Sequence, residues 1–173
     1  MIKVFLNDDL LAKHLALQIL KQLKRKKKLI LGCPGGRSLK KTYFYIGRLS
    51  TKLNISLNNL TIVMMDEYVE KKRGKYSLVN PKSHYSCVRF SQQVIKRLLN
   101  YKKNKKNELK KENILFPPID FPNTYDKKIN TIGGIDVFLL ASGASDGHVA
   151  FNNIYSKLNQ GTHIAKLSKK TRE

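Results

Sequence analysis

The sequence predicts an α/β fold, with a mainly parallel, Rossmann-like sheet covered by helices on both faces. Three observations lead to this prediction. Continuous apolar runs at 29–31, 60–65 and 135–141 alternate with segments of helical periodicity. The runs do not alternate with polar residues, which is typical of parallel strands buried on both faces. Each run ends in a loop of small, polar or acidic residues.

The amino-terminal region predicts a short strand followed by a helix. Residues 2–6 (IKVFL) form the expected strand, and Asn7 is placed to cap the helix. Apolar residues then recur every four positions from Leu11 to Leu23, so the helix has one apolar face for the core. Lysines over 21–28 follow at its carboxyl end, where cations interact favourably with the helix dipole.

Further helices are expected over 39–53 and 85–99. Another helix is expected to close at 129–132, where two glycines at 133 and 134 stop it. The intervening strands are the apolar runs already named, which gives the alternating order of an α/β domain.

Three segments between these elements are expected to be loops. Residues 71–82 are polar and turn-rich, and residues 101–113 are rich in lysine and asparagine. Three prolines within 117–122 mark an irregular connection, because proline cannot donate a backbone hydrogen bond.

Length and composition indicate one globular domain over residues 1–173. Hydrophobic residues make up 41% of the chain, which excludes a disordered protein. No apolar run approaches the roughly 18 residues that cross a bilayer, and the start does not resemble a signal peptide. The prediction is therefore a cytoplasmic protein without a membrane partner. Cysteines 33 and 87 are expected to be reduced and structural, and neither they nor the histidines have metal-ligand spacing.

The net charge of +22 raises the question of nucleic-acid binding. The excess consists mostly of lysine runs, such as 24–28 and 102–111, with few interleaved aromatic residues. Such runs are typical of solvated faces, so no specific nucleic-acid partner is predicted. Salt-sensitive attraction to polyanions still follows from the charge.

Three loops, at 33–38, 66–68 and 142–148, are expected to converge on one pocket, because ligands of open α/β sheets bind at the carboxyl ends of strands. In the first loop, Gly35 and Gly36 let backbone amides approach an anion. Arg37 and Ser38 could add donors directed at a phosphate. An ordinary tight turn explains this loop equally well.

The other two loops carry candidate acid–base groups. Asp66 directly follows a buried strand, and partial desolvation there would raise its pKa and make it a base. The alternative for Asp66-Glu67-Tyr68 is a helix cap or a salt bridge. Asp146 and His148 flank Gly147, and a carboxylate so close to an imidazole can orient it and raise its basicity.

Five segments carry a family resemblance: PGGRSLKKTY, MMDEYV, NPKSHYSCVRF, GGIDVFLLASGASDGHVAFN and SKKTR, in this order. The chain resembles the glucosamine-6-phosphate isomerase/deaminase and 6-phosphogluconolactonase superfamily. The string DGHVAFN is the most specific part and looks like the deaminase branch, whereas the GGR of the first loop is reminiscent of some lactonases.

This resemblance implies a sugar-phosphate substrate and neither metal nor cofactor. Gly35, Gly36 and Ser38 would bind the phosphate, helped by Arg172. His148 would open the sugar ring, oriented by Asp146. Asp66 would move a proton between C2 and C1 of glucosamine 6-phosphate, giving fructose 6-phosphate and ammonia. A homo-oligomer is compatible with the sequence, which does not define the oligomeric state.

Two departures from the family pattern keep other functions open. Asn153 stands where the family has an acidic residue that assists ring opening. Family members also continue beyond this point, so we expect the C-terminal strands to be missing and the domain to be incomplete. One alternative is a 6-phosphogluconolactonase, in which His148 would activate water. The other is a non-catalytic remnant that binds phosphosugars or polyanions.

Overall fold

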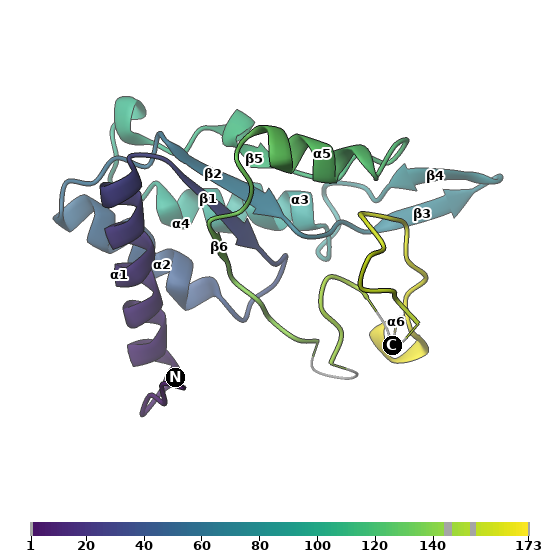
Figure 1. Ribbon diagram of the computed structural model, residues 1–173, viewed down its shortest axis with the longest axis horizontal. Coiled ribbons are helices and arrows are strands. Elements are labelled where there is room, and N and C mark those ends of the chain that lie inside the picture. Colours follow the sequence, from purple (N-terminus) through teal and green to yellow (C-terminus); the bar gives the residue numbers. More distant parts are fainter. Residues whose placement is uncertain (1, 144–146, 153–154, 173) are drawn as a thin grey trace.

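A four-stranded parallel sheet forms the centre of the computed structural model, which describes residues 2–143, 147–152 and 155–172 (Figure 1). Its strand order is β5-β2-β1-β6. The four strands are β1 (Leu29–Cys33), β2 (Leu60–Met64), β5 (Ile114–Leu115) and β6 (Val137–Phe138). All three neighbouring pairs are parallel, so the predicted mainly parallel sheet is confirmed.

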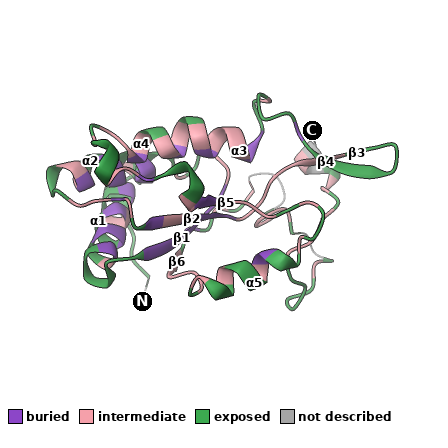
Figure 2. Cartoon of the chain, turned by 90° about the horizontal axis from the view of Figure 1, so that it is seen from above, coloured by how far each residue is buried: buried purple, intermediate pink, exposed green. Residues whose placement is uncertain are grey.

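Helices cover both faces of this sheet, as predicted. One face bears α1 (Asp8–Lys26), α2 (Lys40–Lys52) and a helical run that comprises α3 (Cys87–Phe90), a π-helical turn (Ser91–Lys96) and α4 (Arg97–Leu99). The other face bears α5 (Thr124–Thr131). Figure 2 shows α3 and α4 on the opposite side of the sheet from α5.

The strand sequences explain why both faces need a cover. Leu29 and Leu31 belong to the larger core cluster with α1 and α2, whereas Ile30 between them packs with Tyr125 of α5. Successive side chains of a strand point to opposite faces, so a continuous apolar run places apolar groups on both.

Helix α1 begins and ends as its sequence predicts. The Asn7 side chain accepts a hydrogen bond from the Leu10 amide at 2.9 Å, which caps the first turn. Lys27 adopts a left-handed conformation, with φ of 62°, and terminates the helix. Residues 2–6 do not form the expected strand. Ile2, for example, is 92% exposed, because no other described segment pairs with this stretch.

A β-hairpin replaces the polar loop expected over 71–82. Strands β3 (Val69–Lys72) and β4 (Lys75–Leu78) pair antiparallel and extend from one end of the molecule (Figure 1). Arg73 and Gly74 join them with φ values of 49° and 83°. Two residues with positive φ match the right-handed twist of a hairpin, which explains why so polar a segment forms strands.

The carboxyl-terminal half differs from the prediction mainly in strand length. β6 covers only two residues of the expected run 135–141, because it pairs with β1 alone among the described strands. β5 was not predicted, since a two-residue strand gives no periodic signal. Helix α5 begins at Thr124, and the sequence had indicated only its end, at 129–132. Gly133 and Gly134 follow the helix, as expected, and both have positive φ.

The remaining described elements are short. Two 3-10 turns, Lys105–Asn107 and Lys111–Asn113, lie within the lysine-rich loop, and α6 (Lys169–Arg172) lies at the carboxyl end. None of the helices in the described ranges combines the length and the apolar character needed to cross a membrane.

Candidate functional site

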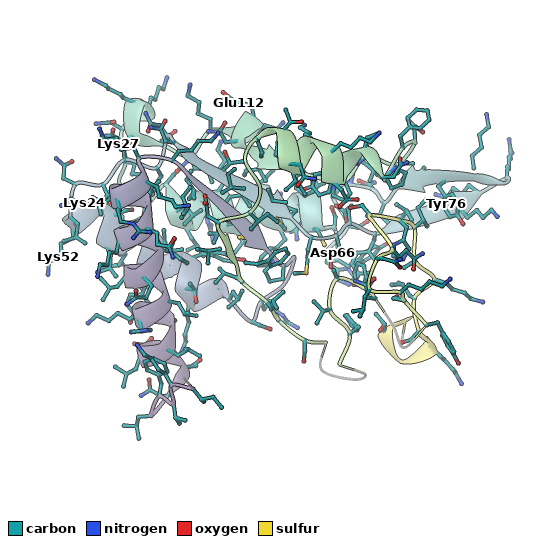
Figure 3. The ribbon with its side chains drawn as sticks, viewed as in Figure 1. Lys24, Lys27, Lys52, Asp66, Tyr76 and Glu112 are labelled. Atoms are coloured by element: carbon teal, nitrogen blue, oxygen red, sulfur yellow. The ribbon has the colours of Figure 1, made fainter. Side chains whose placement is uncertain are left out.

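The site is built where the carboxyl ends of β1 and β2 lie side by side. Cys33 and Met64 are register partners at the ends of these strands, and the Met65 amide donates to the Cys33 carbonyl at 3.1 Å. The glycine-rich loop follows β1 and Asp66 follows β2, so the parallel pairing brings the two loops together. Figure 3 shows Asp66 at this end of the sheet, on the side where residues 155–172 lie.

Asp66 is half-buried, and its carboxyl group has unusual acid–base properties. Burial raises the pKa of its carboxyl group to about 6, and the nearby charge of Glu67 also raises it. Hydrogen bonds from the Cys87 thiol and the Gly35 backbone, together with the charge of His148, hold the pKa down. Asp66 is therefore mainly ionised at neutral pH and is a stronger base than an exposed aspartate.

The Gly35 backbone of the glycine-rich loop lies close to Asp66. A Cβ atom at this position would lie 2.3 Å from the Cys87 sulfur and 3.4 Å from Oδ1 of Asp66. Only glycine permits this approach of the backbone. Gly36 has no atom within 4 Å of the corresponding position, and Arg37 and Ser38 are exposed. The structure thus brings Gly35 to the base and leaves the other three residues at the surface of the loop.

His148 lies in the loop that follows β6 and packs against several groups. Its ring occupies the space beside Gly143, where a Cβ atom would come within 2.2 Å of it. Nδ1 of His148 is 3.3 Å from Oγ1 of Thr171, and the ring centroid is 5.6 Å from that of Phe151. These contacts bring the SKKTR segment to the histidine. The contact between Tyr68 and Phe151 brings the segment after His148 to the second loop. The cavity beside Asp66, however, is lined by no described residue of 33–38 or 142–148, so convergence of all three loops on one pocket stays a prediction.

Three residues of interest lie partly or wholly outside the description. Asp146 and Asn153 are not among the described residues, and only the backbone of Arg172, the last residue of α6, is described. The predicted roles of Asp146 and Arg172 therefore stay predictions.

Glu67 has a role that the sequence suggested only as an alternative for the whole Asp66-Glu67-Tyr68 motif. Its carboxylate accepts hydrogen bonds from the backbone amides of Cys87 at 2.9 Å and Val88 at 2.6 Å, and from Oγ of Ser86 at 3.1 Å. A carboxylate at a helix amino terminus satisfies orphan amides and complements the helix dipole. The two carboxylates of the motif therefore have different contacts. Glu67 caps α3, and Asp66 lies beside the glycine-rich loop.

Two contributors to the site were missed in the sequence. Cys87 was expected to be merely structural, yet its sulfur is 3.4 Å from Oδ1 of Asp66. The rings of Tyr68 and Phe151 are in tilted contact with centroids 4.6 Å apart, which joins the Asp66 loop to the His148 loop. The segments that contain these residues, MMDEYV, NPKSHYSCVRF and DGHVAFN, were recognised, but pairing across the fold has no signal in a single sequence.

A cavity of about 100 Å³ is lined in part by Asp66. Its lining is largely apolar and comes from four regions: the end of β2 with the hairpin, the proline-rich connection, the loop with Phe151, and residues 162–167. Apolar walls of this kind remove water from a carboxylate, which accounts for the raised pKa of Asp66. Within the described ranges, no group of His, Cys, Asp and Glu side chains could hold a metal ion.

Comparisons with known proteins extend over most of the chain. No family model matches it. A glucosamine-6-phosphate deaminase from Clostridium tetani is 31% identical over 178 residues, covering 98% of this chain and 66% of that protein. The chain therefore spans about two thirds of this relative's length.

Solved structures agree in fold. A monomeric glucosamine-6-phosphate deaminase matches with a TM-score of 0.79 at 22% identity, over 96% of this chain and 64% of that one. A 6-phosphogluconolactonase from Thermotoga maritima matches with a TM-score of 0.59 at 20% identity, over 84% of this chain and 60% of that one.

Proposed function

Because the chain belongs to the glucosamine-6-phosphate isomerase/deaminase and 6-phosphogluconolactonase superfamily, we propose that it converts glucosamine 6-phosphate to fructose 6-phosphate and ammonia. The observation that carries the proposal is the placement of Asp66. A half-buried, mainly ionised carboxylate adjoins a glycine-rich loop at the carboxyl ends of two parallel strands. This is the arrangement that an aldose–ketose proton shift on a phosphorylated sugar requires.

Asp66 acts as the base in this reaction. It takes the proton from C2 of the open-chain aldose and returns a proton to C1, which gives an enolamine and then an imine at C2. Water adds to the imine, and ammonia leaves as the ketose forms. A pKa of about 6 suits both steps, because the group is ionised at neutral pH and can still hold the proton in transit.

The glycine-rich loop binds the phosphate in this proposal. Gly35 and Gly36 let the loop backbone approach the anion, and Arg37 and Ser38 supply exposed donors beside them. Arg172 would add a further phosphate donor, as the resemblance to the family implies. The phosphate would thereby fix the sugar with C1 and C2 over Asp66.

His148 opens the pyranose ring by transferring a proton to the ring oxygen, and Asp146 orients it. The packing of the imidazole against Gly143 and Phe151 holds the ring in a defined place. A positioned imidazole is well suited to proton transfer near neutral pH. A cytoplasmic location and the lack of a specific nucleic-acid partner stay predictions, and a homo-oligomer stays compatible with the sequence.

A 6-phosphogluconolactonase is the second candidate function. The fold likeness to a lactonase and the Gly-Gly-Arg loop favour it. In that reaction His148 would activate the water that attacks the lactone carbonyl, and Asp66 would not need to move a proton between carbons. The Ala-Phe-Asn that follows Val149 argues for the deaminase.

The test is a product assay on the purified chain with glucosamine 6-phosphate, in which ammonia and fructose 6-phosphate are both measured. We expect Asp66→Asn and His148→Ala each to abolish both products, and Asp120→Asn, at an exposed loop position, to leave them unchanged. Faster hydrolysis of 6-phosphogluconolactone would instead support the lactonase. If the chain catalyses neither reaction, the result would support a non-catalytic binding module.

A further inference from the structure

The Cys87 thiol lies between the proposed base and the proposed phosphate loop. Cys87 is the first residue of α3 and is 1% exposed. Its sulfur is 3.4 Å from Oδ1 of Asp66, a hydrogen-bond distance for a thiol donor, and it fills the space against which the Gly35 backbone packs. One side chain thus contacts both halves of the site.

Glu67 fixes the position of this thiol. Its carboxylate accepts the backbone amides of Cys87 and Val88, while the Ser86 hydroxyl accepts the amide of Arg89 and caps the same helix. Asp66 and Glu67 are consecutive in the chain and lie in one loop. The Glu67 carboxylate binds the backbone amide of Cys87, and the Asp66 carboxylate contacts its thiol. The geometry of the thiol relative to Asp66 is therefore set from two sides.

The thiol is a neutral donor in this position. Burial raises the pKa of Cys87 far above its ordinary value, and the charges of Asp66 and Glu67 raise it further. The thiol therefore stays protonated at neutral pH, so it donates a hydrogen bond to the carboxylate and does not repel it. A thiol is a weaker donor than a hydroxyl or an amide.

The other groups around Asp66 come from three elements. Glu67 and Tyr68 share its own loop, His148 faces it from the loop after β6, and the Gly35 amide donates from the loop after β1. The charge of Glu67 disfavours the ionised carboxylate, whereas His148 and the Gly35 amide favour it. The Cys87 thiol is a weak donor, so its hydrogen bond fixes the position of the Asp66 carboxylate and lowers its pKa without bringing it back to the ordinary value.

We propose that Cys87 is a positioning residue, whose weak thiol hydrogen bond holds the Asp66 carboxylate against the glycine-rich loop. The catalytic consequence rests on the proposed function, but the hydrogen bond itself does not. A hydroxyl at this position would stabilise the carboxylate more strongly, and a methyl group would not stabilise it at all. Cys87→Ser and Cys87→Ala should therefore move the titration of Asp66 in opposite directions.

The experiment follows the side-chain carboxyl carbon of Asp66 by NMR across pH in the full chain. We expect a midpoint about half a pH unit or more higher in Cys87→Ala and lower in Cys87→Ser. Cys33→Ser is the matched control, because Cys33 is also a buried thiol but has Tyr43 as its neighbour in place of Asp66. It should leave the midpoint unchanged.

Kinetics supply the second readout. The acid limb of the kcat profile with glucosamine 6-phosphate should shift in the same directions as the NMR midpoint, with little change in KM. A chain without this activity would refute the proposed function, while the NMR titration would still decide the role of Cys87. Identical Asp66 titrations in wild type and Cys87→Ser would overturn the inference, even if Cys87→Ala failed to fold.

Discussion

The carboxylate of Glu67 accepts a hydrogen bond from the backbone amide of Val88 at 2.6 Å, across 21 positions of the chain. This contact, with that to the Cys87 amide, ties the end of β2 to the start of α3. Glu67, which follows the proposed base Asp66, is thereby joined to α3. The first residue of α3 is Cys87, whose thiol contacts Asp66. The site therefore depends on how α3 docks, and this can be tested apart from catalysis.

Glu67→Gln should destabilise the fold, because the amide keeps one acceptor oxygen but turns an NH2 group towards backbone amides. Loss of hydrogen bonds to a charged group costs about 1.5–3 kcal/mol, and urea unfolding measures the change in free energy. Glu112→Gln, at an exposed position, is the matched control and should change stability by less than about 0.5 kcal/mol. Equal effects of the two variants would show that Glu67 does not anchor α3.

Asp66 should make stability depend on pH in the direction opposite to most carboxylates. Its pKa is about 6 in the folded state and near 3.8 when unfolded, so folding takes up a proton between these values. Stability therefore falls as pH rises from about 4 to above 6. Asp66→Asn removes the carboxylate charge and should be more stable than wild type by about 3 kcal/mol at pH 8, and by only about 0.5 kcal/mol at pH 4.

The measurement is urea unfolding of both proteins at several pH values. A difference in unfolding free energy that does not change with pH would contradict the raised pKa of Asp66. The same variant is expected to lose ammonia release, so stability and activity should move in opposite directions. Such a trade-off is typical of a functional group that is held in an unfavourable environment.

Gly35→Ala should disrupt the junction of the glycine-rich loop with Cys87, because the added Cβ would meet the sulfur at 2.3 Å. Overpacking of this kind costs about 1–3 kcal/mol. Gly36→Ala is the matched control, since open space surrounds that position, and it should be close to neutral for stability. Thermal unfolding of both variants tests the difference.

A double variant sharpens this test. Combining Gly35→Ala with Cys87→Ala removes the sulfur, so part of the lost stability should return. The coupling between the two positions is expected to be about 1 kcal/mol. Strict additivity of the two single changes would indicate that the loop and the thiol do not compete for the same space.

The sequence predicted those parts of the fold that depend on local pattern. β1, β2, α1 and α2 follow from continuous apolar runs, helical periodicity and the cap at Asn7, which are properties of short segments. The β3–β4 hairpin was missed because its strands are polar or exposed and have no apolar face to detect. Its one local signal is Arg73-Gly74, where two positive φ values form the turn.

The same distinction holds for the candidate site. Asp66 and Gly35 could be placed together in advance, because parallel strands bring their carboxyl ends to one edge of the sheet. The contacts of Cys87 and Glu67 could not, since they arise when a helix about 20 positions away docks onto that edge. The failed strand at 2–6 has a related cause: alternation and hydrophobicity are not enough without a partner strand.

Glucosamine 6-phosphate should raise the thermal stability of the chain if the three loops form a working pocket. A ligand that binds only the folded state stabilises it by about 2.7 kcal/mol at a hundredfold excess over its Kd. The shift should be much smaller with glucosamine, which lacks the phosphate, and with Arg37→Ala, because Arg37 is exposed on the proposed phosphate loop. Lys52→Ala removes an exposed charge at the carboxyl end of α2 and should retain the full shift. Equal shifts with Arg37→Ala and Lys52→Ala would mean that the phosphate responds to the net charge of +22 and not to the glycine-rich loop.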